Sequence, residues 1–329
     1  MSIEHVIAAI QKNNNFLVIT HANSEGDALG SELALCLLLR SMGKKAVIIN
    51  EDPVPEEYAF LPNADLVQTF HERYLKSSFD AYILVDCAEL SRCGELARMP
   101  FDAKPVINID HHISNTNFGT VNWVDPVASS ASEMVYRLYK KMEAPFTYET
   151  AMQLYVGIMT DTGSFKYSNT LAATHAAAAE LIASGIDVAK VHRQVYESVP
   201  LKDMVFLSKL LPALKTSLHG KIIWFSVKAS ALKKQSTSFD LSEHLLAFGR
   251  SVRGVEVVAV FKENLGVKNE IRINLRSQGS VDVNAIARSF GGGGHTTASG
   301  ATVRGKISVV ERNVVRAIRT AVEALGNPS

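Results

Sequence analysis

Side chains that can bind metal ions follow several short apolar runs of this sequence. The run PVINI leads directly into Asp110, His111 and His112, AYILV leads into Asp86, and FLVIT leads into His21. A strand has little structural reason to end on a carboxylate and two imidazoles, although a solvated turn would explain any one of these endings alone. Their recurrence after three apolar runs favours a functional site.

Three further carboxylates belong to the same pattern. Glu25 and Asp27 follow His21 in THANSEGDALGS, and Asp161 ends an apolar run in GIMTDTGSF. Taken singly, Asp27 could cap the helix that follows it, and Glu25 could complement the dipole of that helix. Chance is a poor explanation for the joint arrangement, so we include all three in the candidate site.

The candidate set combines carboxylates with imidazoles and contains no thiolate. Closed zinc sites favour Cys and His, whereas a mixed set suits Mn²⁺, with Mg²⁺ and Co²⁺ as alternatives. Six or so ligands are too many for one ion with open positions, so we expect two divalent ions about 3.5–4 Å apart that share one carboxylate. Such a pair activates water and binds the oxygens of an in-line phosphoryl displacement. Asp86, alone after its apolar run, is the expected bridge.

These side chains can meet if the runs are parallel strands of one sheet. The expected strands are residues 16–20, 45–50, 81–86 and 105–110, and the expected helices are 28–43, 130–142, 147–159 and 174–185. Apolar strands separated by helices predict an α/β fold with a doubly wound, mainly parallel sheet covered on both faces. Ligands of such sheets bind outside the carboxyl ends of the strands. Asp161 would end a helix, with a strand as the alternative.

The pattern changes near Pro200. A connecting helical stretch at 199–216 is followed by expected strands at 221–227, 254–263 and 270–277 and by a final amphipathic helix at 308–325. This arrangement predicts a smaller α+β domain. We therefore expect a metal-binding catalytic domain over residues 1–195, a linker over 196–204 and a substrate-binding domain over 205–329, with a cleft between the two domains.

The second domain carries its own candidate site, FGGGGHTTASG at 290–300. Consecutive glycines usually mark a backbone that must approach something closely, and their N–H groups beside His295 could bind a phosphate or carboxylate. A flexible hinge is the common alternative for such a run. Arg276 and Ser277 lie at a preceding strand end, where Arg offers a bidentate grip on phosphate.

Charge is divided unevenly along the chain. The net charge is +1, but residues 1–199 hold 15 basic and 24 acidic residues, whereas residues 200–329 hold 19 and 9. The two parts therefore carry −9 and +10, which suits cation binding by the first and anion binding by the second, although two docking surfaces would also explain it.

The three cysteines form no CxxC pair, no apolar run is long enough to span a bilayer, and the first residues contain no secretory signal. We expect a cytoplasmic protein with reduced thiols and no membrane partner.

These motifs resemble those of the DHH phosphoesterase superfamily. HANSEGDALGS is similar to its first motif, LVDCAE to the second, NIDHHISN to the third and MTDTGSF to the fourth. The segment from NLRS to GGGGHTTASG resembles the DHHA1 substrate domain, and the match covers nearly the whole chain in the same order. Length and layout are most similar to the NrnA-like branch, which degrades very short oligonucleotides and removes the 3′-phosphate of pAp, the nucleoside bisphosphate.

The resemblance implies a role for each candidate residue. One Mn²⁺ would be held by His21, Glu25 and Asp86, and the other by Asp27, Asp86, His111 and Asp161. The catalytic residues would be Asp86, Asp110, His111 and His112, with Asp110 and His112 orienting ligands and transition-state oxygens. The nucleotide would be bound by Arg276, Ser277, Gly291, Gly292, Gly293, Gly294 and His295.

One departure concerns the first motif, which usually has Pro-Asp-Gly-Asp where this chain has Ser24-Glu25-Gly26-Asp27. Glu25 keeps the carboxylate but adds a methylene, so the metal preference stays open.

The resemblance implies an enzyme that hydrolyses short single-stranded RNA, of about two to five nucleotides, and pAp. Alternatives are a phosphodiesterase of cyclic di-AMP or linear dinucleotides, a single-strand DNA exonuclease of the RecJ type, and a nucleotide sensor without turnover. The chain has no extensive interleaving of aromatic and basic residues of the kind that binds long single strands, which disfavours the exonuclease. A homodimer is one alternative for the assembly.

Overall fold

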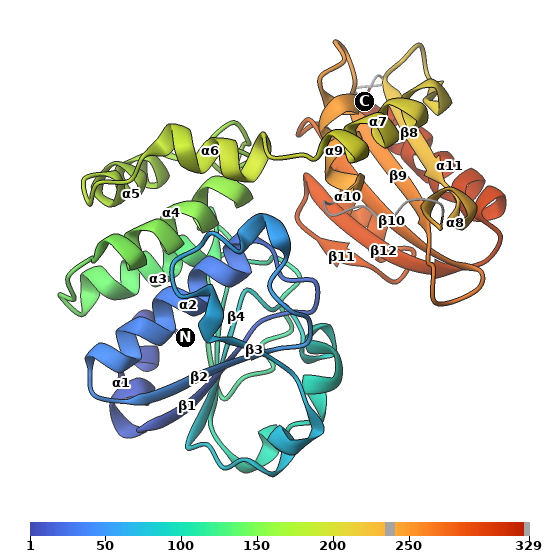
Figure 1. Ribbon diagram of the computed structural model, residues 1–329. Helices are drawn as coiled ribbons and strands as arrows, with labels where there is room; N and C mark the ends of the chain where they lie inside the picture. The colour runs from blue at the N-terminus through green and yellow to red at the C-terminus, as the bar shows by residue number, and fades with distance from the viewer. Residues whose placement is uncertain (234–240, 326–329) are drawn as a thin grey trace. The chain divides into compact units, whose positions relative to one another are not determined.

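The computed structural model describes residues 1–233 and 241–325 (Figure 1). The chain forms two compact units, Met1–Ser198 and Val199–Ser329, called here the N-terminal and C-terminal units. Each unit has its own six-stranded sheet and its own hydrophobic core. Among the described residues, no helix combines the length and the apolar character needed to cross a bilayer.

The sheet of the N-terminal unit is entirely parallel, as the apolar strands predicted. Its spatial order is β3 (Val67–Thr69), β2 (Lys45–Asn50), β1 (Asn15–Ile19), β4 (Ala81–Val85), β5 (Val106–Asp110) and β6 (Val121–Val124). The chain starts at β1, builds outward through β2 and β3, and then returns to β4 on the other side of β1. The strand order therefore reverses between β1 and β4, which is where open α/β sheets bind their ligands.

Helices pack on one face of this sheet. The helices α1 (Ile3–Lys12), α2 (Gly26–Ser41) and α3 (Ala131–Lys141) contact its strands. The helices α4 (Tyr148–Asp161), α5 (Ala172–Ile182) and α6 (Val188–Tyr196) extend the same core outside them. Helix α2 is apolar nearly all round because it lies against the sheet and against α3 and α4 (Figure 1). The expected helices are thus present, although each boundary moves by a few residues.

The opposite face of the sheet has a different cover. Instead of long helices it carries 3₁₀ segments at Glu72–Lys76, Leu90–Arg98 and Phe101–Ala103. The ring of Tyr82 in β4 packs edge-on against Phe79 and Phe101, with ring centroids 6.1 and 4.9 Å away. Aromatic packing of this kind closes the second core without a full helical layer.

The C-terminal unit contains a mixed sheet. Its order is β11 (Gly293–Gly294), β12 (Ala298–Arg304), β10 (Glu270–Ser277), β9 (Val257–Glu263), β8 (Ile222–Val227) and β7 (Lys215–Ser217). Among the described residues of this unit, only β8 and β9 pair in parallel, and the other neighbouring strands are antiparallel. The helices are α7 (Leu201–Leu210), α8 (Ala229–Leu232), α9 (Leu241–Arg250), α10 (Val283–Arg288) and α11 (Ile307–Leu325). This is the expected smaller α+β architecture.

One prediction for the C-terminal unit needs correction, and one strand was missed. The helical stretch expected at 199–216 ends earlier, because α7 stops at Leu210 and residues 215–217 form β7. Strand β12 was not predicted from the sequence, since ASGATVR has small residues and no clear apolar alternation.

Candidate metal centre

The candidate residues of the N-terminal unit gather at the carboxyl edge of its sheet. His21 follows β1, Asp86 follows β4, and Asp110 is the last residue of β5. Strands β1 and β4 are the neighbours between which the strand order reverses. The fold therefore places His21 and Asp86 at the position where α/β sheets bind ligands.

Asp86 lies at the centre of this group. Its carboxylate is buried, with Oδ2 3.4 Å from His21 Nε2 and Oδ1 3.5 Å from His111 Nε2 and 3.6 Å from His112 Nδ1. No hydrogen bond reaches Oδ1 from the described residues. Asp86 also has a φ of 53°, a backbone conformation that is uncommon for a residue other than glycine and that recurs at functional sites.

Two histidines turn the same ring atom toward the carboxylates. His21 Nδ1 lies 2.9 Å from the carbonyl oxygen of Ala22, and His111 Nδ1 lies 3.3 Å from that of Ala128. A carbonyl only accepts hydrogen bonds, so each Nδ1 carries a proton. Burial opposes the charged form of both rings, but Asp86 raises the pKa of His21, and Asp161 and Asp86 raise the pKa of His111 well above its usual value. Each Nε2 therefore holds a proton that faces carboxylate oxygens, and a metal ion bound at Nε2 would take the place of that proton.

The side chain of Asp27 lies where helices α2, α3 and α4 meet. It lies in the first turn of α2, yet its carboxylate accepts hydrogen bonds from the backbone N–H groups of Ala131 (2.6 Å) and Ser132 (2.8 Å) at the start of α3. The alternative that Asp27 caps its own helix is therefore wrong. A Cβ added at Gly157 of α4 would lie 1.9 Å from Ser132 Oγ and 3.0 Å from Asp27 Oδ1, so glycine permits this close approach.

Asp161 and Glu25 complete the surroundings of the buried group. Asp161 is the last residue of α4, which confirms the helix expected there, and its Oδ2 lies 3.7 Å from His111 Nε2. Asp27 Oδ2 lies at the same distance from this nitrogen. Glu25 is exposed, but its carboxylate can reach within 4.8 Å of ligand atoms of both His21 and Asp86. The added methylene of Glu25 therefore does not remove it from the group.

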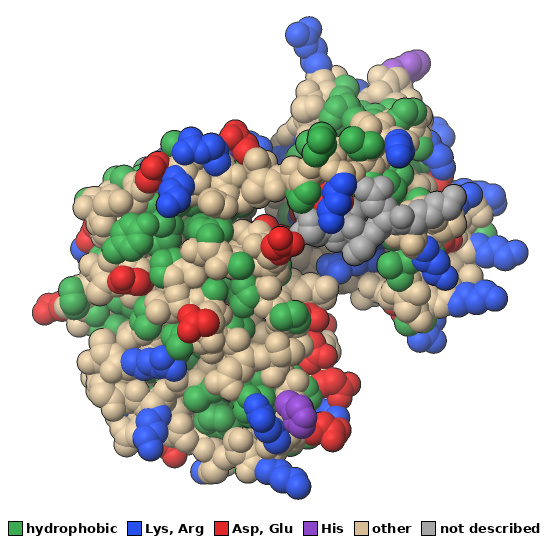
Figure 2. Space-filling model, viewed as in Figure 1, with side chains coloured by type: hydrophobic (Ala, Val, Ile, Leu, Met, Phe, Trp, Pro, Cys, Tyr) green, Lys and Arg blue, Asp and Glu red, His purple; other side chains and the backbone are tan. Residues whose placement is uncertain are grey.

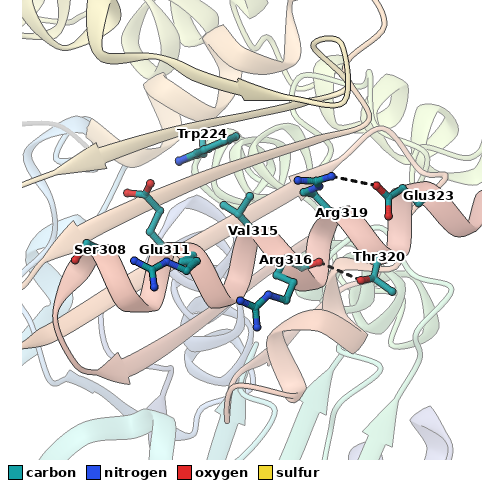
Figure 3. Close-up of a pocket in the computed structure, with 9 residues that line it drawn as sticks. Trp224, Ser308, Glu311, Val315, Arg316, Arg319, Thr320 and Glu323 are labelled. Carbon is teal, nitrogen blue, oxygen red and sulfur yellow. Dashed lines mark hydrogen bonds and ion pairs between the residues drawn. The ribbon is translucent and has the colours of Figure 1, made fainter.

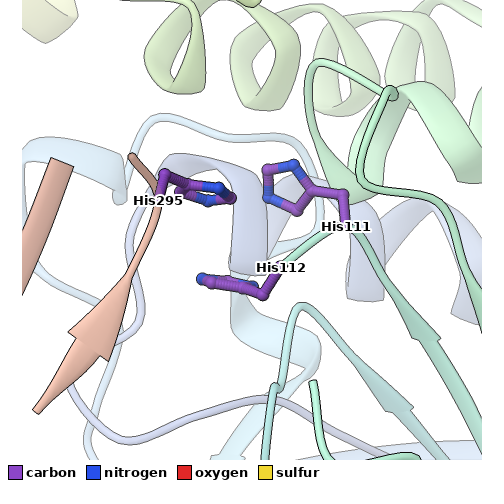
Figure 4. A group of neighbouring side chains, drawn as sticks. All are labelled: His111, His112 and His295. Carbon is purple, nitrogen blue, oxygen red and sulfur yellow. The ribbon is translucent and has the colours of Figure 1, made fainter. Parts of the chain in front are cut away.

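Asp110 and His112 form a pair beside Asp86. Asp110 Oδ1 lies 2.7 Å from His112 Nδ1, and Asp110 Oδ2 accepts a hydrogen bond of 2.6 Å from Asn115 Nδ2. The rings of His112 and His111 lie next to one another, 5.1 Å apart between centroids (Figure 4). With both oxygens engaged, Asp110 is placed to orient His112. Asn115 was not singled out from the sequence, although it lies in the same NIDHHISN motif.

The protonation equilibria reflect this crowding of opposite charges. Burial raises the pKa of Asp27 to about 6, and the negative charge of Asp86 adds to that shift. Burial also opposes ionisation of Asp86 and Asp110, but His111 and His21 hold the pKa of Asp86 well below its usual range, and His112 holds that of Asp110 at about 2. Burial raises the pKa of Asp161 well above its usual value. Carboxylates so close together need a compensating positive charge.

Three groups of side chains in the N-terminal unit could each hold a metal ion. They are His21–Glu25–Asp86, Asp27–Asp86–His111 and Asp86–Asp110–His112. Asp86 belongs to all three, and its Oδ1 is a buried acceptor to which no described residue donates a hydrogen bond. The donor set, the orientation of the histidine rings and this acceptor all fit divalent cations bound around a shared Asp86.

The arginine and serine predicted in the C-terminal unit lie at the end of β10. The guanidinium of Arg276 forms an ion pair with Glu243 of α9, and 17% of its side chain is exposed. Ser277 is buried, and its hydroxyl accepts a weak hydrogen bond of 3.4 Å from the backbone of Gly279. Arg276 is therefore a partly buried guanidinium paired with a carboxylate, and Ser277 is buried at the end of the same strand.

The glycine run and His295 are held by β12. A Cβ at Gly292 would lie 2.0 Å from the carbonyl oxygen of Gly300, and Gly293 and Gly294 pair with β12 as the short strand β11. The hydroxyl of Ser299 donates a hydrogen bond of 2.7 Å to the carbonyl of His295. Close packing of this segment against β12 therefore explains why glycine is needed at Gly292. The following glycines, Gly293 and Gly294, form the short strand β11.

Comparisons with known proteins agree with this architecture. Residues 15–158 match the model of the DHH family, N-terminal domain, and residues 214–327 match the DHHA1 domain. The chain is 31% identical to the bifunctional oligoribonuclease and PAP phosphatase NrnA of Thermus thermophilus, over 94% of this chain and 90% of that protein. It is also 31% identical to the Bacillus subtilis protein of the same name, over 91% and 92% of the two chains.

A solved structure shows the same fold. The exopolyphosphatase-related protein of Bacteroides fragilis superimposes with a TM-score of 0.85 at 26% identity, and the match covers 99% of this chain and 97% of that one. The likeness extends through both units of the chain.

Proposed function

We propose that this chain, which belongs to the DHH phosphoesterase family and carries a DHHA1 domain, hydrolyses very short oligoribonucleotides to mononucleotides and removes the 3′-phosphate of pAp. The observation that carries the proposal is the buried Asp86, which three candidate ligand groups share at the switch point of the sheet. Relatives at 31% identity over more than nine-tenths of this chain, named for both activities, support the choice of substrates.

We further propose that two Mn²⁺ ions are the cofactor. His21, Glu25 and Asp86 would hold one, and Asp27, Asp86, His111 and Asp161 would hold the other. The absence of a thiolate from the set favours Mn²⁺ over a structural Zn²⁺. When bound, the ions would supply electrostatic stabilisation and an activated nucleophile for phosphoryl transfer.

The other side chains of the site position the reacting groups. The Asp110 carboxylate fixes the ring of His112, and Asn115 fixes that carboxylate in turn. The imidazole of His112 would bind a phosphate oxygen or transfer a proton. The Asp27 carboxylate is fixed by the start of α3, which keeps its remaining lone pairs directed toward His111.

The C-terminal unit would contribute substrate binding. Arg276 is the group most suited to a phosphate, because its guanidinium is partly exposed and its present partner Glu243 can be exchanged for a stronger anion. The N–H groups of the glycine run and the imidazole of His295 would add contacts to the nucleotide. In this proposal, residues 1–195 catalyse the reaction and residues 205–329 bind the substrate.

The proposal is tested by offering several phosphate esters to the purified protein in parallel. With Mn²⁺ present, we expect rapid turnover of an RNA dinucleotide and of pAp, and slow turnover of an RNA 20-mer, single-stranded DNA and cyclic di-AMP. Preference for cyclic di-AMP or long DNA would retain the metal chemistry and overturn the substrate assignment. Binding without turnover of any ester would indicate a sensor instead.

Two variants identify the source of any activity. Asp86→Asn removes the shared ligand while keeping its shape, and Asp102→Asn makes the same change at an exposed position outside the site. Activity should disappear only in the first. Equal activity in both variants would assign the turnover to a contaminating enzyme.

A further inference from the structure

A groove on the C-terminal unit lies between helix α11 and strand β8 (Figure 3). Its volume is about 720 Å³, and its lining includes Trp224, Arg312, Arg316 and Arg319. None of these residues belongs to the candidate metal centre or to the predicted phosphate-binding residues. The proposed function therefore assigns no role to this groove.

Three arginines form a line along α11. Arg312, Arg316 and Arg319 are all exposed, and their spacing of four and three residues places them on one side of the helix. The rise of an α-helix puts Arg316 about 6 Å and Arg319 about 10 Å beyond Arg312 along the axis. Cations repeated along one side of a helix can contact several phosphates of one nucleic-acid strand.

The acidic residues of the groove already have cationic partners. Glu311 accepts hydrogen bonds from Lys215 Nζ (2.8 Å) and from Ser226 Oγ (2.6 Å), and Glu323 lies 3.4 Å from Arg319. Within residues 1–233 and 241–325, no ion pair joins Arg312 or Arg316 to a carboxylate. Two of the three arginines thus have their charge available for an external anion.

Trp224 adds an aromatic surface beside these cations. Trp224 is partly exposed on β8 with its indole nitrogen buried, and the side chain lines the groove together with Val315 and Arg319 (Figure 3). Aromatic rings flanked by arginines bind single-stranded nucleic acids, because a base can stack on the ring while its phosphates contact the cations. A free inorganic anion would gain nothing from the indole.

The groove and Arg276 lie on opposite faces of the same sheet. Trp224 is in register with Ala259, and Ala259 with Leu275, so these three side chains share the face that α11 covers. Arg276 follows Leu275 and therefore points to the other face. The groove is a second basic site, not an extension of the predicted phosphate grip.

We propose that the α11–β8 groove binds the backbone of single-stranded RNA longer than a dinucleotide, with one base on Trp224 and phosphates on Arg312 and Arg316. This inference rests on the proposed function, since it supplies a holding site for RNA chains that the metal centre shortens. The large positive charge of residues 200–329 is consistent with an RNA partner and would draw the polyanion to this unit. A dinucleotide would be bound by the metal centre and by Arg276 and the glycine run, and it would not need the groove.

The test measures RNA binding and turnover separately. Fluorescence anisotropy with an unstructured, labelled RNA 12-mer, in EDTA to prevent cleavage, compares the wild type with Arg312→Glu/Arg316→Glu and with Trp224→Leu. The matched control is Lys221→Glu/Lys268→Glu, which reverses two exposed charges of the same unit outside the groove. Hydrolysis of an RNA dinucleotide with Mn²⁺ is measured for every variant.

We expect the double arginine variant to weaken 12-mer binding at least tenfold, and Trp224→Leu to weaken it severalfold. Dinucleotide turnover should stay within twofold of the wild type in both. Loss of two phosphate contacts should also reduce the slope of log K against log salt by about 1.4.

If the double arginine variant binds the 12-mer as the wild type does and its dinucleotide turnover is intact, the proposal of RNA binding by the groove is wrong and the proposed function is unaffected. An equal loss in the lysine control would also overturn the proposal of RNA binding by the groove, because general charge would then explain the binding. A wild-type protein that hydrolyses no RNA dinucleotide would instead overturn the proposed function.

Discussion

The two units present their charged residues in opposite ways. In the N-terminal unit, carboxylates and imidazoles are buried within 4 Å of one another and fixed by hydrogen bonds to backbone groups. In the C-terminal unit, the arginines of α11 are exposed, and Figure 2 shows Lys and Arg side chains projecting from the visible face of this unit. Small, highly charged ions require the first arrangement, and a flexible polyanion suits the second.

The comparison also separates two kinds of contribution to a reaction. Charged groups that are fixed in a site of low dielectric constant lower the activation free energy, because they need no reorganisation during the reaction. Exposed cations mainly change how often and how tightly a substrate is bound. Variants of the two units should therefore affect different kinetic parameters.

The largest expected effect comes from Asp86. The substitution Asp86→Asn should lower kcat by more than about 10³-fold, because it removes the carboxylate that all three ligand groups share. Steady-state hydrolysis of an RNA dinucleotide measures this, with Asp102→Asn as the control. A decrease in kcat of less than tenfold would mean that Asp86 is not the shared ligand, and the N-terminal unit would then not dominate kcat.

A smaller effect is expected at Asp110, whose two oxygens hold His112 and Asn115. Asp110→Asn should reduce kcat by about 10- to 100-fold with bound manganese unchanged, because it disturbs the orientation of His112 without removing a ligand. Kinetics combined with metal analysis of the purified protein measure both quantities. Loss of an ion in this variant would identify Asp110 as a ligand, which the Asp86–Asp110–His112 group also permits.

In the C-terminal unit, Arg276→Ala should raise KM for the dinucleotide by about tenfold and leave kcat nearly unchanged. The reason is that Arg276 would contribute equally to binding of the substrate and of the transition state. Arg272→Ala, an exposed position on the same face of β10, serves as the control. A fall in kcat alone would mean that Arg276 stabilises the transition state more than the bound substrate. The C-terminal unit would then contribute to the chemical step and not only to binding.

The smallest effect is expected at Glu25, which is exposed and carries one methylene more than the Asp of the usual motif. Glu25→Asp should tighten manganese binding or raise activity by less than about tenfold. Glu149→Asp makes the same change at an exposed position outside the site. Unchanged values for both properties would mean that the departure from the motif is neutral.

The sequence predicts much of the N-terminal site because strand ends are visible in it. Runs of apolar residues that stop at His21, Asp86 and Asp110 mark the carboxyl edge of a parallel sheet, and Asp161 ends a helix of clear pattern. The order of the strands then brings these residues together. No long-range information beyond the fold class is needed for this part of the site.

The supporting contacts could not be predicted in the same way. Asp27 binds the start of α3, 104 and 105 residues away, and no local pattern encodes a carboxylate that caps another helix. The close approach of Gly292 to Gly300 depends on the pairing of β11 with β12, whose sequence has no strand periodicity. Both features follow from packing between distant segments.

Titration of Mn²⁺ into metal-free protein in a calorimeter shows whether two metal ions share Asp86. We expect two ions per wild-type chain, two per Asp102→Asn chain, and loss of at least one from Asp86→Asn. Two tightly bound ions in Asp86→Asn, or a single ion in the wild type, would contradict this expectation.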